Sequence, residues 1–173
     1  MKNSVIDEQG FKELINNPDN DSAKKYTIDY GLFKTFENYE IYDTKFEYGE
    51  LYEKNVVIDR CLFNKVDIDG AEFKEMLWFK NCTFQGDFTI KEGSMRSLMF
   101  INCEFIEGIT IYNAKVVDNF SINNCNAKYP ILIKGGIYKN FTYYALNEKT
   151  HLKISGAFTF IEHFKLKWFK LIC

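Results

Sequence analysis

The sequence predicts an all-β protein, a parallel β-helix (β-solenoid) of about six coils with an N-terminal cap that contains a short helix. The first observation is a repeat, because Cys61, Cys82, Cys103 and Cys125 are 21, 21 and 22 residues apart. The second is that the apolar residues around each cysteine alternate with period two, which is typical of short strands with one buried face. The third is composition, since 17 Phe and 11 Tyr with only 2 Pro favour strands.

Each repeat unit of 21–22 residues is predicted to contain about three short strands separated by bends. Stacked units bury each inward residue against its equivalent in the next coil, so like residues form ladders about 4.8 Å apart. The inward positions are Val56/Ile58, Leu77/Phe79, Leu98/Phe100 and Phe120/Ile122; Phe63, Phe84 and Phe105; Val66/Ile68, Phe88/Ile90, Ile109/Ile111 and Ile131/Ile133; and Phe73, Met95, Val116 and Ile137.

Asparagine recurs at one position of the unit. Asn81, Asn102 and Asn124 each precede a cysteine, and Arg60 stands at the equivalent place in the first unit. Asparagine tolerates left-handed backbone and can bond to its neighbours above and below, so we expect an amide ladder at a bend. Asn140 is predicted to be a turn residue for the same reason.

The two ends of the stack need covers, because an open end exposes unpaired backbone groups and apolar side chains. We expect residues 1–34 to form an N-terminal cap, with a short helix over 7–17 that places Phe11, Leu14 and Ile15 on one face. Residues 35–160 are predicted to form the solenoid and 161–173 a C-terminal cap, all within one structural domain.

The cysteines form the most conspicuous constellation, and we interpret them as small inward side chains beside the Phe ladders. A zinc site needs ligands that converge on one ion, often from close Cys pairs with His, and one Cys per coil gives a column instead. The sequence therefore predicts reduced thiols, no metal site and no cofactor. Because no apolar run approaches the roughly 18–20 residues of a membrane span, we expect a cytoplasmic protein with no membrane partner.

Charge is unevenly placed along the chain, although the net charge is only −2. Residues 1–60 hold 13 acids and 8 bases, whereas residues 131–173 hold 2 acids and 7 bases. The sequence therefore predicts an electrically polar molecule. Lysine outnumbers arginine 20 to 2, a bias that hints at a bacterial or phage origin.

Two features could support other functions. The acids Asp67 and Asp69, or Asp87 and Glu107, could serve a carbohydrate-active enzyme, which needs two carboxylates at a set separation in a cleft. At the C-terminus, lysines alternate with aromatic residues, a composition that can bind nucleic acid by charge and stacking, or that can cap the last coil. Joining of copies through a solenoid end, as a homodimer or a self-assembling structural rod, is the other alternative.

Four short motifs resemble the unit of the pentapeptide-repeat family within the right-handed parallel β-helix class. They are Cys61-Leu-Phe63, Ala71-Glu-Phe73, Cys82-Thr-Phe84 and Cys103-Glu-Phe105, each a small residue followed two positions later by an inward Phe. The period of 21–22 residues departs from the family's 20. That family includes rods that mimic the charge and shape of duplex nucleic acid and inhibit enzymes that act on it.

We therefore expect a non-catalytic protein that binds a larger protein partner, such as a bacterial defence nuclease or topoisomerase, and inhibits or modulates it through a charged solenoid surface. The predicted contact residues are Glu37, Glu40, Asp43, Glu47, Glu50 and Glu53 on an acidic side, and Lys165, Lys167, Trp168 and Lys170 on a basic side that could also contact nucleic acid.

Overall fold

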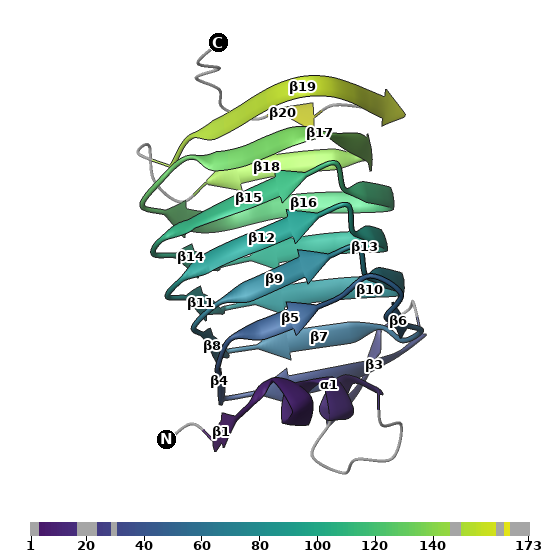
Figure 1. The fold of residues 1–173 in the computed structure, drawn as a ribbon, viewed down its shortest axis with the longest axis vertical. Helices are drawn as coiled ribbons and strands as arrows, with labels where there is room; N and C mark the ends of the chain where they lie inside the picture. Colours follow the sequence, from purple (N-terminus) through teal and green to yellow (C-terminus); the bar gives the residue numbers. More distant parts are fainter. Residues whose placement is uncertain (1–3, 17–23, 29–30, 146–149, 162–164, 167–173) are drawn as a thin grey trace.

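A computed structural model of the chain describes residues 4–16, 24–28, 31–145, 150–161 and 165–166 (Figure 1). They form a parallel β-solenoid of about five turns with one short N-terminal helix. The elements in chain order are β1 (Ser4–Ile6), α1 (Glu8–Asn16), β2 (Lys24–Ile28), β3 (Gly31–Glu37), β4 (Tyr39–Ile41), β5 (Thr44–Phe46), β6 (Leu51–Tyr52), β7 (Val56–Asp59), β8 (Leu62–Phe63), β9 (Val66–Asp69), β10 (Glu72–Lys80), β11 (Thr83–Phe84), β12 (Asp87–Lys91), β13 (Ser94–Ile101), β14 (Glu104–Phe105), β15 (Gly108–Tyr112), β16 (Lys115–Ala127), β17 (Ile131–Lys139), β18 (Phe141–Ala145), β19 (Leu152–Ile161) and β20 (Lys165–Leu166).

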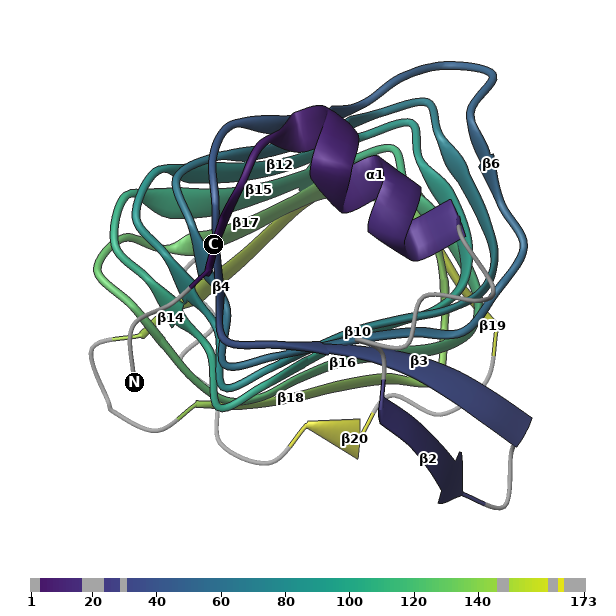
Figure 2. The ribbon, with the colours of Figure 1, turned by 90° about the horizontal axis from the view of Figure 1, so that it is seen from below.

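Each coil passes through four walls. The β7 wall contains β3, β7, the second half of β10, β13 and β16, and then β18. The short β8 wall contains β4, β8, β11, β14 and the end of β16, and the β9 wall contains β5, β9, β12, β15 and the first halves of β17 and β19. The β6 wall starts with β6 and the first halves of β10, β13 and β16. The β7 and β9 walls lie on opposite sides of the coil (Figure 2).

The core consists of the predicted ladders. Strands one circuit apart pair in parallel, whereas β2 pairs antiparallel with β3. Residues one circuit apart lie in register, as in Phe79 with Phe100 and Phe84 with Phe105. The rings of the first pair stack at 5.3 Å and 7°, and those of the second at 4.9 Å and 6°. Strand spacing imposes this stacking, because equivalent side chains on neighbouring strands are about 4.8 Å apart.

The predicted asparagine bend is confirmed. Asn81, Asn102 and Asn124 have φ of 53°, 53° and 52°, and Arg60 at the equivalent position has 53°. Asn140 is also left-handed, with φ of 47°. The left-handed residue forms the corner at which the chain turns from one wall to the next. At this corner the backbone N–H of Asn81 donates to the carbonyl of Ile101 in the next coil at 2.8 Å. Asparagine thus lets the corner form at little steric cost.

One predicted core residue is wrong. Ile137 is 39% exposed, whereas Tyr138 is 1% exposed and pairs with Val116 in the core. The cause is one extra residue in β16: Met95 pairs with Val116, but Ser97 pairs with Asn119. The core residue that pairs with Val116 in the next coil therefore comes 22 residues later, at Tyr138, and not 21 residues later. The hydroxyl of Tyr138 donates to the carbonyl of Gly135 at 2.9 Å, so the larger side chain is accommodated without an unpaired polar group.

The coil count and the boundaries also differ in detail from the expectation. The chain forms about five turns, not six. The sixth unit, from Phe141, contributes β18 and β19, but the segment that joins them includes residues 146–149, which lie outside the described residues. β3 pairs with β7 and starts at Gly31, so the first wall begins four residues before the expected boundary at residue 35.

Helix α1 lies across the N-terminal end of the coil stack (Figure 2). Asp7 caps it, since its carboxylate accepts a hydrogen bond from the N–H of Gly10 at 2.8 Å. Phe11 and Ile15, one turn apart on the same face, are buried at 1% and 2% exposure. The Phe11 ring meets the edges of Phe46 and Phe63 at 6.2 and 5.7 Å, so the predicted cap helix continues the aromatic core.

Candidate interaction surface

The outward side of the β7 wall carries few charged side chains from β7 to β18. Alternation along its strands turns Leu77 and Phe79 inward and Trp78 outward, and every paired strand repeats this pattern. Above β3, where Glu37 stands in register with Asp59, only two of the ten outward residues on β7, β10, β13, β16 and β18 carry charge, namely Asp59 and Lys80. The ten form two columns, Val57, Trp78, Met99, Ser121 and Thr142, then Asp59, Lys80, Ile101, Asn123 and Tyr144; we call them the low-charge face.

Trp78 lies at the apolar centre of this face. Its register neighbours are Val57 in the coil below and Met99 in the coil above, and Ile101 stands beside Met99. The indole is half-buried, and Val57 is only 8% exposed although it points outward. These side chains therefore cover one another and form a continuous apolar strip across three coils.

The indole N–H of Trp78 is shielded and finds no hydrogen-bond acceptor among the described residues. A buried donor without an acceptor costs about 1–3 kcal/mol, and tryptophan N–H groups usually have a partner when they are buried. An acceptor from a docked chain would relieve this cost. The orphaned donor thus singles out Trp78 from the rest of the wall.

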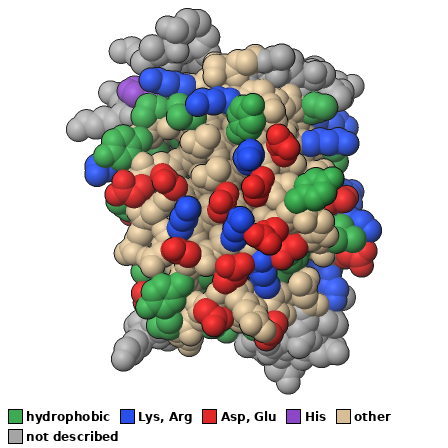
Figure 3. All heavy atoms as spheres, viewed as in Figure 1, with side chains coloured by type: hydrophobic (Ala, Val, Ile, Leu, Met, Phe, Trp, Pro, Cys, Tyr) green, Lys and Arg blue, Asp and Glu red, His purple; other side chains and the backbone are tan. Residues whose placement is uncertain are grey.

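The opposite wall has a different character. Six of its eleven outward residues are charged. Figure 3 shows acidic and basic side chains mixed on this side of the molecule. The eleven are Lys45, Asp67, Thr89, Thr110, Leu132 and Lys153 in one column, and Asp69, Lys91, Tyr112, Lys134 and Ser155 in the next. The low-charge face is therefore a property of one wall and not of the repeat.

The residue composition of the low-charge face matches that of a protein–protein interface. The centres of protein interfaces are depleted in Lys, Glu and Asp and enriched in Trp, Tyr and Met. Trp78 and Met99 occupy the centre of the low-charge face, and Tyr144, which is 46% exposed, lies at its upper margin. The polar residues between them, Ser121 and Thr142, already share a hydrogen bond at 2.9 Å, so they would cost little to cover.

The acidic residues predicted as contacts do not form a comparable surface. They are spread over different walls of the first coil, and four of the six are ion-paired within the chain. The pairs are Glu37 with Arg60 at 2.7 Å, Glu47 with Lys45 at 2.8 Å, Glu50 with Lys12 at 2.8 Å and Glu53 with Lys74 at 2.9 Å. Glu40 is half-buried on β4, and Asp43 is exposed before β5.

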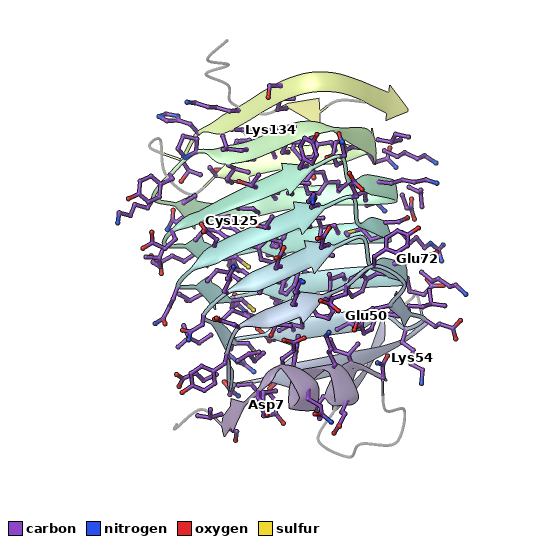
Figure 4. All side chains as sticks on the ribbon, viewed as in Figure 1. Asp7, Glu50, Lys54, Glu72, Cys125 and Lys134 are labelled. Carbon is purple, nitrogen blue, oxygen red and sulfur yellow. The ribbon has the colours of Figure 1, made fainter. Side chains whose placement is uncertain are left out.

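Glu50 in particular has a structural role. Its carboxylate accepts hydrogen bonds from the backbone N–H of Glu47 at 2.7 Å, the hydroxyl of Tyr52 at 3.1 Å and the ammonium of Lys12 on α1 at 2.8 Å. Figure 4 shows Glu50 close to the cap helix. It attaches the cap helix to the first coil.

The predicted basic contacts fall at the edge of the described structure. Lys165 belongs to β20, which pairs with β18 at the C-terminal end of the β7 wall. Lys167, Trp168 and Lys170 lie outside the described residues.

The carboxylates weighed for glycoside chemistry lie on the surface. Asp67 and Asp69 both point outward from β9, and Asp69 is 3.9 Å from the ammonium of Lys91. Asp87 and Glu107 are exposed. A glycosidase needs its two carboxyl groups within a cleft that binds the sugar, and none of these four lies in a described cleft.

The cysteines form the expected inward column. Cys61, Cys82, Cys103 and Cys125 are all buried, and none of these four forms a disulfide bond (Figure 4 labels Cys125). The Cys82 thiol donates to the carbonyl of Ile58 at 3.3 Å. Burial raises the pKa of the Cys61 thiol to about 11, so it stays protonated and unreactive at neutral pH. Within the described part of the chain, no group of His, Cys, Asp and Glu side chains is placed to hold a metal ion.

Sequence reasoning missed the low-charge face because it followed the inward residues. The outward position between two inward ones reads Val57, Trp78, Met99, and an apolar residue there three times in succession is the signal that could have revealed it. In the described ranges, no helical segment combines the length and apolarity that crossing a bilayer requires. Comparison of the chain with protein-family models, with curated proteins and with solved structures finds no match.

Proposed function

We propose that this protein is a non-catalytic binding protein that docks a larger protein partner on the low-charge face, with Trp78 at the centre of the contact. The observation that carries the proposal is the contrast between the two large walls, of which one is charged and the other presents Trp78, Met99 and Ile101. Apolar and aromatic anchors surrounded by neutral polar side chains are the composition of an interface core. The β-sheet beneath them is rigid, so little ordering is needed on binding.

For the class of partner, the proposal draws on a resemblance in the sequence. The likeness to pentapeptide-repeat rods supports a bacterial enzyme that acts on nucleic acid as the partner, and inhibition or modulation as the outcome. An acidic docking side finds less support, because Glu37, Glu47, Glu50 and Glu53 are neutralised by partners in the same chain. Surface pairs of this kind contribute little affinity, and we assign the affinity to the apolar strip.

Site-specific photo-crosslinking tests the proposal. A benzoylphenylalanine introduced at Met99 should give an adduct with a larger protein in a bacterial lysate, and the same group at Thr110 on the β9 wall should not. Both positions are half-buried and outward in the same region of the stack, so they are matched in exposure. The Trp78→Glu variant should abolish the Met99 adduct, and its thermal unfolding should be measured to show that it still folds.

Equal yields of the adduct with a larger protein at Met99 and Thr110 would refute the proposal, whereas an adduct with a second copy of this chain would not bear on it. An adduct at Met99 that survives Trp78→Glu in a folded protein would contradict the central role of Trp78.

A further inference from the structure

One column of the β9 wall is self-complementary in charge. Asp69, Lys91, Tyr112 and Lys134 follow one another in register on β9, β12, β15 and β17. Lys91 and Lys134 are exposed, Tyr112 is 42% exposed and Asp69 is half-buried. From the N-terminal end upward, the column contains an acid, a base, an aromatic residue and a base. If a second copy of the column faces it upside down, each acid faces a base and each remaining base faces an aromatic ring.

The whole molecule has a matching asymmetry along the solenoid axis. Because chain order equals height in the stack, the acids of the first half lie at the N-terminal end. Above Asp118 the described residues, 119–145 and 150–161, contain no Asp or Glu, and they contain Lys128, Lys134, Lys139 and Lys153. In Figure 3 basic side chains accordingly gather toward the upper end of the β9 wall and acidic ones below.

We propose that two copies of this chain pair antiparallel through their β9 walls. A two-fold axis that lies between the facing walls and runs along the strands keeps each residue's place on its strand and reverses the order of the coils. With the axis between β12 and β15, Asp69 of one copy faces Lys134 of the other, and Lys91 faces Tyr112. Thr89 faces Thr110, so the side chains at the centre of the interface are small. Because of the two-fold axis, every contact occurs twice.

The chemistry of these contacts is ordinary for this chain. Lysine over tyrosine already occurs within it, since the ammonium of Lys128 lies 5.1 Å from the ring centre of Tyr129. The same axis brings Lys45 near Lys153 at the margin, where Lys45 is neutralised by Glu47 at 2.8 Å. The orientation also sets the acidic end of each copy beside the basic end of its partner.

A parallel arrangement is disfavoured by the same residues. A two-fold axis along the solenoid would bring Asp67 against its own copy and Lys153 against its own copy, and like charges that face each other are repulsive. The footprint of five or so strands is roughly 24 Å by 16 Å, which is below the size of standard specific interfaces and in the range of weak encounters. The dimer is therefore a weak one that depends on ionic strength.

The pairing leaves the low-charge faces free. The β7 wall lies on the opposite side of the coil from the β9 wall (Figure 2), so a dimer would present two low-charge faces on its outer sides. The dimer does not depend on the proposed function, because it uses a different wall. If both hold, the dimer is a bivalent binder.

Sedimentation equilibrium at about 50 mM salt and micromolar to near-millimolar concentrations tests the pairing. Wild type should dimerise, with a Kd that rises about tenfold or more in 500 mM NaCl. Asp69→Lys and Lys134→Glu should each weaken the dimer at least about tenfold, and the double variant, in which the two charges are exchanged, should return to within about threefold of wild type. The exchange distinguishes a direct pair from a general loss of charge.

The matched control is Arg96→Glu on the β6 wall, where Arg96 pairs with Glu75 at 2.8 Å, and it should leave the Kd unchanged. Circular dichroism melting should show that each variant folds. A wild-type protein that stays monomeric throughout, a double variant that stays as weak as either single one, or a dimer lost on Trp78→Glu but kept in Lys134→Glu would each overturn the proposal.

Discussion

The side-chain amide of Asn102 donates a hydrogen bond to the carbonyl oxygen of the Asn81 side chain one coil below, at 3.1 Å. Asn81 in turn donates to Asp59 at 2.8 Å, so the ladder ends on a carboxylate. Asn81 and Asn102 also have the left-handed backbone of the corner in their own coils. In these two coils one asparagine therefore both turns the chain and ties it to the coil below.

Replacement of Asn102 should separate these two contributions. Asn102→Gly removes the side-chain hydrogen bond but tolerates φ of 53°, whereas Asn102→Ala also introduces left-handed strain. We expect the alanine variant to be less stable than the glycine variant by about 1 kcal/mol, measured by guanidinium denaturation. At Thr83, on extended strand β11, the order should reverse, with Gly less stable than Ala. The same order at both positions would contradict the corner argument.

Removal of a ring from the aromatic ladder should be costly. Phe100 is fully buried, stacks on Phe79 at 5.3 Å and meets the edge of Phe88 at 5.1 Å. Phe100→Ala should lower the free energy of unfolding by about 3–5 kcal/mol, because flat neighbouring strands cannot collapse into the cavity. Phe100→Leu keeps most of the volume and should cost clearly less. Urea denaturation of both variants checks this, and equal losses would show that ring stacking rather than volume matters.

Stability should fall at alkaline pH. Burial raises the pKa of Cys61 to about 11 and raises that of Cys103, and a hydrogen bond with Cys103 together with burial raises that of Cys125. An unfolded thiol titrates near about 8.5, so above that pH the unfolded chain binds fewer protons than the folded one. The free energy of unfolding should be level below about pH 8 and then fall by up to about 1.4 kcal/mol per pH unit for each such thiol.

Denaturant titrations between pH 7 and 10 measure this slope. Cys61→Ala should show a shallower slope than wild type, because one shifted thiol is gone. A wild-type slope that is flat up to pH 10 would mean that the thiols deprotonate while the protein stays folded.

The ion pair between the cap and the first coil should be measurable. Lys12 and Glu50 lie 2.8 Å apart with side chains 18% and 32% exposed, while Lys74 and Glu53 lie 2.9 Å apart at 47% and 65%. A double-mutant cycle with Lys12→Met and Glu50→Gln should give a coupling of about 1 kcal/mol. The exposed pair, treated in the same way, should give about half of that or less. A larger coupling in the exposed pair would exclude the assigned role of Glu50.

The features that recur in every coil were predictable from the sequence, whereas the features that occur in one coil or join two coils were missed. Cys82 and Cys103 are one circuit apart, so a single register explains the ladders, the asparagine corner and the inward column of thiols. Ile137 was placed wrongly because β16 contains one extra residue between Val116 and Asn119, and a period alone cannot locate such an insertion. The acidic residues were read as free because the ion pair of Glu53 with Lys74 joins residues 21 positions apart, and only a known coil height brings them together.

Trp78 shows the same limit on the outside of the coil. Its neighbours on the surface are Val57 and Met99, which are distant in the chain, so an apolar patch forms from residues that look isolated in the sequence. Element identity follows from local alternation, whereas surface character depends on which coils lie side by side.

The column of thiols places one concealed reporter in each of four successive coils. A thiol reagent cannot reach a sulfur until the two coils around it separate. The labelling rate of a variant that retains a single cysteine therefore measures how often that coil opens. A comparison of the labelling rates at Cys61, Cys82, Cys103 and Cys125 would show whether the solenoid unfolds progressively from one end or in a single cooperative step.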